Sequence, residues 1–383
     1  MHVEERRVLI LLSIAGLVAI LSSTASKSPT LPLFAEYLGA KSGEMEVIAA
    51  ASTLAGIVVN VTADALSDIY GRRKNAPNIR FFFASSPFLY LLVREPWQLI
   101  IVRVYHGVAT AVFTPAAIAA IADIYHERRG EMMGYFSSAT LLGRLMAPSI
   151  AGTMITLYSF YATYMLCGVF GIIALIVLLG FPETSKVRST RRKVNVRLLS
   201  ILTNVRIIAA SCIMALTYFA MQSIETFLPL YMETLKVESW LIGVTFTIEL
   251  AVIALLKPYG GRLYDCIGEG KVIGIGVVLS SLGVALIAFS TTYIFILLSV
   301  MLFATGVAFA TASIPPLVSK VVEKESYGTA LGAMETIKDV GQALGPIAMG
   351  VILMFTTYKL AFIIVAIVTL TSLLLNIVLR NRK

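Results

Sequence analysis

The residues of this chain best able to do chemistry are charged side chains that stand inside long apolar segments. They comprise three carboxylates and four basic groups, namely Glu225, Glu249, Asp339, Lys27, Arg103, Arg144 and Lys338. An ionised side chain that faces hydrocarbon is costly, so each of these groups should face a polar space or a partner of opposite charge.

A sheltered carboxylate that gains and loses a proton can couple proton movement to other events. Glu225 and Asp339 are the first candidates for this role, Glu249 is the third, and Arg103 with His106 is a further candidate relay. The alternative for each carboxylate is permanent ionisation beside a nearby Lys or Arg. The alternative for His106 is ordinary packing with a hydrogen bond.

Polar and aromatic side chains near these charges predict where a small molecule would bind. Lys27 lies in a polar run from Ser22 to Ser28, and Pro29 and Pro32 follow, as expected of a broken helix that holds a solute. The candidate binding residues are Lys27, Arg144, Gln222, Tyr218 and Lys338. Aromatic surface with few charges suits an amphipathic or hydrophobic organic molecule better than a sugar.

The elements that position these groups are predicted to be membrane-spanning helices. Of the 383 residues, 58% are hydrophobic and the mean hydropathy is +0.86, which excludes an ordinary soluble domain. Apolar runs of roughly 20 residues, the length that crosses a bilayer, follow one another with short breaks. Twelve are predicted, at about 8–38, 44–66, 79–93, 97–122, 131–156, 161–181, 207–234, 240–258, 272–290, 294–319, 328–356 and 361–379.

The net charge of +9 is a signal of topology rather than of nucleic-acid binding. Basic residues gather in alternate connections, and most densely between residues 182 and 206, as expected when both termini lie in the cytoplasm. That basic connection either forms a short helix at the membrane interface or only orients the chain. We expect a multi-pass protein of the cell membrane, a monomer in contact with lipid, with no nucleic-acid partner.

Enzyme chemistry is not expected from this sequence. No phosphate-binding G-x4-G-K-[ST] loop is present, and Cys167, Cys212 and Cys266 lack the spacing of a metal site. We therefore predict no metal and no cofactor.

The second half of the chain repeats the first about 198 residues later. Gly134, Gly143, Pro148 and Gly152 recur as Gly332, Gly341, Pro346 and Gly350. Matched glycines and prolines in two apolar halves predict duplicated helix sets around a central pathway. The predicted parts are a six-helix bundle over 1–181, a cytoplasmic linker over 182–206 and a second six-helix bundle over 207–383. Glu335, Asp339 and Gln342 should share one helix face, roughly opposite the seam of Gly341 and Gly345.

Three motifs resemble those of the major facilitator superfamily. The stretch from Asp64 to Lys74 resembles its G-x-L-x-D-[RK]-x-G-R-[RK] signature, with Asp64 and Ile69 as departures. Arg103-Val-Tyr-His106-Gly107 resembles its R-x-x-Q-G element, with His in place of Gln. The run from Gly134 to Gly152 resembles the antiporter signature G-x8-G-x3-G-P-x2-G-G, with two glycines replaced by alanine.

The resemblance implies a twelve-helix carrier of two pseudo-symmetric bundles that works by alternating access and exports small organic molecules in exchange for protons. It also implies a conformational switch made of Asp68, Gly71, Arg72 and Asp123. In this family the fifth helix lies beside the eighth, so an Arg144–Glu249 pair is predicted. A proton-coupled importer, a uniporter and a translocator of lipids or lipid-linked solutes remain as alternatives.

Overall fold

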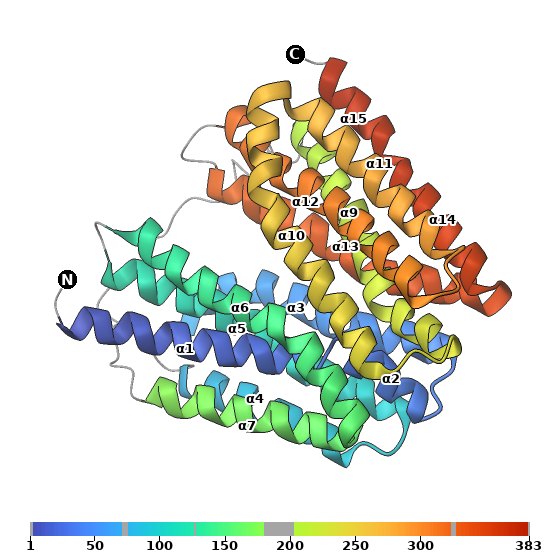
Figure 1. Cartoon of the computed structure of the whole chain (residues 1–383). Coiled ribbons are helices and arrows are strands. Elements are labelled where there is room, and N and C mark those ends of the chain that lie inside the picture. Colours follow the sequence, from blue (N-terminus) through green and yellow to red (C-terminus); the bar gives the residue numbers. More distant parts are fainter. Residues whose placement is uncertain (1–2, 71–75, 126–127, 180–202, 323–326, 382–383) are drawn as a thin grey trace. The chain divides into compact units, whose positions relative to one another are not determined.

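The computed structural model describes residues 3–70, 76–125, 128–179, 203–322 and 327–381, and all regular structure in these ranges is helical (Figure 1). The helices form two compact units. The first comprises Met1–Glu44, Ala51–Thr190 and Glu238–Thr247. The second comprises Met45–Ala50, Arg191–Val237 and Ile248–Lys383. The predicted bundle boundaries at residues 181 and 207 stay a prediction.

The first unit is built mainly from the helices that precede residue 180. They are α1 (Val3–Ala25), α2 (Thr30–Tyr37), α3 (Ser42–Tyr70), α4 (Ala76–Leu89), the 3-10 turn η1 (Tyr90–Leu92), α5 (Pro96–Ile124), α6 (Arg129–Leu157) and α7 (Phe160–Leu179). The apolar run from 8 to 38 is thus divided just before Pro29, because proline cannot donate the backbone hydrogen bond that would continue a helix. Lys27 lies in this break.

The second unit is built mainly from the helices that follow residue 203. They are α9 (Val205–Thr234), α10 (Ser239–Ile267), α11 (Glu269–Ile287), α12 (Tyr293–Val321), α13 (Tyr327–Phe355), α14 (Tyr358–Leu370) and α15 (Ser372–Asn381). Asn204 starts α9 by accepting hydrogen bonds from the backbone amides of Arg206 and Ile207, at 3.0 and 3.4 Å. Gly268, at φ +84°, permits the turn between α10 and α11.

The predicted repeat recurs in the packing of each unit. In the first unit, a Cβ added at Gly143 on α6 would collide with the backbone carbonyl of Leu17 on α1. In the second, a Cβ at Gly341 on α13 would collide with the carbonyl of Ala215 on α9. Both glycines and both carbonyls stand 198 residues apart (341 − 143 and 215 − 17). The same backbone-to-backbone seam is therefore made once in each half.

Two helices contribute to both units. The stretch Met45–Ala50 of α3 groups with the second unit, where the Glu46 side chain packs so closely on Gly350 that a Cβ there would collide with it. The stretch Glu238–Thr247, which includes the first turns of α10, groups with the first unit, where a Cβ at Gly152 would collide with the carbonyl of Ser239. Gly152 and Gly350 are themselves repeat counterparts, but Gly152 meets backbone whereas Gly350 meets the Glu46 side chain.

The length of the helices and their exposed apolar side chains indicate a membrane protein. In the described residues, nine helical segments are long and apolar enough to span a bilayer. The other predicted spans, at 44–66, 79–93 and 97–122, fall on α3, on α4 with η1, and on α5, whose side chains are described only in part. Large apolar side chains are exposed along α7, α11 and α14, including Met165, Val169, Ile176, Val278, Leu282, Leu360 and Ile367. This is an all-α membrane protein with lipid-suited outer faces.

Candidate functional site

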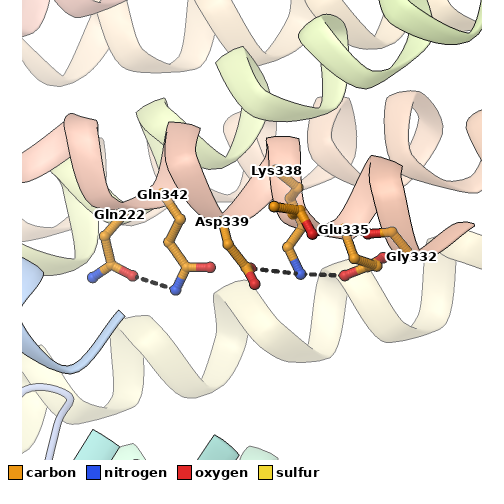
Figure 2. A network of polar contacts seen from close by, with 7 residues as sticks. Gln222, Gly332, Glu335, Lys338, Asp339 and Gln342 are labelled. Carbon is orange, nitrogen blue, oxygen red and sulfur yellow. Dashed lines mark hydrogen bonds and ion pairs between the residues drawn. The ribbon is translucent and has the colours of Figure 1, made fainter. Parts of the chain in front are cut away.

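Four polar residues follow one another along a single face of α13. Glu335, Lys338, Asp339 and Gln342, here called the α13 row, are spaced by one to four residues, and Figure 2 shows their side chains leaving the helix on the same side. Residues three and four apart lie above one another on a helix. The predicted shared face of Glu335, Asp339 and Gln342 is therefore confirmed.

Lys338 is the best-partnered charge in the α13 row. Its ammonium nitrogen forms ion pairs with Glu335 Oε2 and, at 3.2 Å, with Asp339 Oδ1 (Figure 2). The same nitrogen lies 5.0 Å from the ring centre of Tyr218, on α9. The Lys338 side chain is 15% exposed, that of Asp339 23% and that of Glu335 50%. An embedded cation is thus neutralised by two carboxylates and an aromatic face.

A hydrogen bond from Gln342 connects the α13 row to α9. Its side-chain amide nitrogen donates to the amide oxygen of Gln222 at 3.0 Å. Gly341 and Gly345 also pack on α9, against Ala215 and Phe219. The prediction that Glu335, Asp339 and Gln342 lie roughly opposite this seam is therefore wrong for Gln342. Adjacent helix positions differ by only about 100°, so Gln342 sits at the edge of the seam rather than across from it.

Two further carboxylates lie in the second unit. Glu249 on α10 is 3% exposed, and it interacts electrostatically with Glu225 on α9, which is half-buried. Glu225 stands three residues, or about one turn, after Gln222. Gln222, Glu225, Glu249 and the α13 row thus belong to one unit and come from three helices, and their positions span 120 residues of the chain (342 − 222).

The first unit holds a buried basic cluster on α5. Arg103 and His106 are 3% and 2% exposed, and Arg103 donates a hydrogen bond to the hydroxyl of Ser52 on α3. The Tyr90 hydroxyl lies 3.3 Å from His106 Nδ1, and the Tyr90 ring stacks on that of Tyr164 with centres 4.3 Å apart. The sequence analysis missed both tyrosines, because neither carries a charge and their proximity to His106 depends on the packing of η1 against α5 and α7.

The other predicted site residues fare differently. Lys27 is half-buried in the break between α1 and α2, and Arg144 is exposed on α6. Arg144 and Glu249 belong to different units, so the predicted pair stays a prediction. Gly71 and Arg72 lie outside the described residues, and the side chains of Asp68 and Asp123 lie outside the described side chains.

The antiporter-like residues form a packing surface on α6 rather than a binding site. Gly134 has open space around it, whereas Gly143 and Gly152 each touch backbone of another helix. Pro148 lies inside α6, and a Cβ at Gly243 on α10 would collide with its carbonyl oxygen. The α6 surface from Gly143 to Gly152 therefore contacts α1 and the start of α10 without side chains between them.

The hydroxyl of Thr247 on α10 forms hydrogen bonds with backbone groups of α6 close to this proline. Thr247 Oγ1 donates to the carbonyl of Leu145 at 3.0 Å and accepts from the amide of Ser149 at 3.2 Å. The Ser149 hydroxyl also donates to it, at 2.7 Å. An α-helix joins the carbonyl of Leu145 directly to the amide of Ser149, so the threonine bridges two groups that would otherwise pair. No sequence pattern pointed to Thr247.

Metal chemistry finds no support in the described side chains, where no group of three His, Cys, Asp or Glu residues could hold an ion. The three cysteines are free thiols.

Comparison with known proteins gives consistent matches over most of the chain. A family model described as Major Facilitator Superfamily matches residues 12–248 and 239–383. An uncharacterized MFS-type transporter of Methanocaldococcus jannaschii is 29% identical over 84% of this chain and 85% of that protein. A multi-drug resistance efflux pump, the PmrA homolog of Lactococcus lactis, is 23% identical over 89% and 87% of the two chains. The solved structure of a bacterial homolog to the human lysosomal transporter Spinster has a TM-score of 0.79 at 15% identity, covering 98% and 97% of the two chains.

Proposed function

This chain belongs to the Major Facilitator Superfamily, and we propose that it is a proton-coupled antiporter that exports small amphipathic or hydrophobic organic molecules. It is a multi-pass membrane transporter and not an enzyme. The proposal adds the direction of transport, the coupling ion and the class of substrate.

The observation that carries the proposal is the pair of carboxylates, Glu225 and Glu249, embedded within helices long enough to span a membrane. Two embedded carboxylates that interact electrostatically disfavour ionisation of both, so in the proposed mechanism one of them holds a proton. A proton held there changes the charge of the unit that also contains Gln222 and the α13 row. Proton uptake and cationic substrate binding would then compete for the same groups.

The close packing of α6 against its neighbours supports an antiporter rather than a uniporter. Gly143, Pro148 and Gly152 seal this helix against its neighbours with backbone contacts, and Thr247 bridges its backbone beside the proline. The similarity to a multi-drug resistance efflux pump supports export of organic compounds. In the proposed cycle, protonation of an embedded carboxylate releases substrate outward, and loss of the proton to the cytoplasm permits the next substrate to bind.

Proton release from proteoliposomes tests this proposal. The full chain is reconstituted with a pH-sensitive dye inside, a pH gradient is imposed, and ethidium or tetraphenylphosphonium is added. We expect substrate-dependent proton movement that is lost in Glu225→Gln or Glu249→Gln and kept in Glu131→Gln, which removes an exposed carboxylate that pairs with Arg128. Substrate transport without any proton movement, or equal proton movement in all three variants, would contradict the proposal.

A further inference from the structure

The surroundings of the Lys338 ammonium group have the composition of a site for an organic cation. Two carboxylates and an aromatic ring converge on it, from Glu335, Asp339 and Tyr218. Carboxylates supply charge and hydrogen-bond acceptors, and the face of an aromatic ring attracts an ammonium group within about 6 Å of its centre. We call these three side chains the ammonium site; Lys338 occupies it in this structure.

The fold does not require this site. The repeat counterparts of Glu335, Lys338 and Asp339 on α6 are Ser137, Thr140 and Leu141, each 198 residues earlier and none of them charged. Nevertheless α6 packs on α1 through Gly143 as α13 packs on α9 through Gly341. Because one copy of the seam forms without any of these charges, helix packing does not explain why the second half carries them.

The ammonium site is open at one end and continues into polar groups at the other. Exposure falls from 50% at Glu335 to 23% at Asp339. One turn further, Gln342 bonds to Gln222, which is 4% exposed. A molecule whose ammonium group entered the site would therefore meet amide donors and acceptors next to it. The lysine side chain has four rotatable bonds, so its ammonium group can leave without movement of the helix.

We propose that Tyr218, Glu335 and Asp339 bind the ammonium group of a transported organic amine, and that Lys338 is an internal substitute that fills this site until the amine displaces it. The inference rests on the proposed function, because it assumes a small organic substrate. Lys338 then gives both carboxylates an ion-pair partner and balances one of their two charges while no solute is bound, and it tunes how tightly an amine binds.

The expected size of the effect follows from competition. An incoming amine binds only when Lys338 has left, so its apparent affinity is reduced by the fraction of protein in which the site is open. If Lys338 fills the site for about 90% of the time, the apparent affinity falls about tenfold. Removing the lysine ammonium group should therefore strengthen amine binding, although it removes a contact from the protein.

Ligand titration of the purified full chain at one fixed pH tests the proposal. The probes are benzylammonium and its uncharged analogue benzyl alcohol. We expect Lys338→Met to bind benzylammonium at least about tenfold more tightly than the unchanged protein, with no change for benzyl alcohol. Adding Asp339→Asn to Lys338→Met should abolish the gain. The matched control is Lys320→Met, since Lys320 also lies over a tyrosine ring, that of Tyr264 at 4.5 Å, but outside the α13 row.

Two outcomes would overturn the proposal. One is no gain for benzylammonium in Lys338→Met, and the other is an equal gain for benzyl alcohol, which would indicate only a more apolar surface. Lys338→Gln serves as a second variant where the methionine variant does not fold, because it removes the ammonium charge but keeps a polar side chain; it too should bind benzylammonium more tightly, with no change for benzyl alcohol. The titration uses no pH gradient, so it is independent of the transport assay. If benzylammonium does not bind as expected while proton-coupled export is intact, only the ammonium site is refuted. Amine binding without proton movement refutes only the proposed coupling.

Discussion

The glycine seam between α9 and α13 permits a prediction whose size can be worked out from the structure. A Cβ added at Gly341 would lie 2.6 Å from the carbonyl carbon and 2.7 Å from the Cα of Ala215, and closer still to its oxygen, whereas ordinary contacts begin near 3.4 Å. Gly341→Ala must therefore part the two helices. A separation of about 1 Å forfeits up to half of the dispersion energy across the seam, and such overpacking costs about 1–3 kcal/mol.

The matched control is Gly332→Ala, on the same helix, where a Cβ meets open space. Alanine there should leave stability unchanged or raise it by up to about 1 kcal/mol through helix propensity. The assay is thermal unfolding of the purified full chain in detergent, in which each kcal/mol shifts Tm by about 2–4 °C for a unit of this size. Gly143→Ala should behave like Gly341→Ala, because Gly143 makes the counterpart seam. If Gly341→Ala melted at the same temperature as Gly332→Ala, the close approach of these helices would be refuted.

Three further predictions follow. Thr247→Val should destabilise the protein by about 1–2 kcal/mol, because it removes the bridge in α6, whereas Thr245→Val, whose hydroxyl bonds only within its own helix, should cost less; equal losses in thermal unfolding would contradict this. Arg144→Ala and Glu249→Ala should show a coupling of about 0.5–3 kcal/mol in a double-mutant cycle of transport activity, and additive losses would exclude the pair. Arg103→Lys should lower stability by about 1.5–3 kcal/mol, since it loses the guanidinium hydrogen bond to the Ser52 hydroxyl, and unchanged melting would exclude a structural role for that bond.

The duplicated packing was predictable from the sequence because it depends on glycine and proline, whose spacing is visible without a structure. Gly143 and Gly341 were identified by their equal spacing to Pro148 and Pro346, and each lies against backbone of a neighbouring helix. The shared face of Glu335, Asp339 and Gln342 was predictable for a similar reason, because helix geometry alone places residues four apart on one side.

Contacts between distant segments were not predictable, because no local pattern records them. Thr247 reaches the backbone of Leu145 across 102 residues, and Tyr90 meets His106 only because η1 and α5 pack together. The position of Gln342 was misjudged for a different reason. The prediction assumed that only Gly341 and Gly345 face α9, whereas α9 contacts both Gly341 and the adjacent Gln342.

The two halves of the chain separate what the fold requires from what function adds. Both halves keep the glycines that bring helix backbones together, so selection for the fold accounts for Gly143 and Gly341 alike. The halves differ in their embedded charges, since Arg144 stands where the second half has Gln342, and Thr140 stands where it has Lys338. A charge within a membrane helix is costly, and its uncharged counterpart shows that the same packing forms without it. The charges present in only one half are therefore where substrate and proton binding should be sought first.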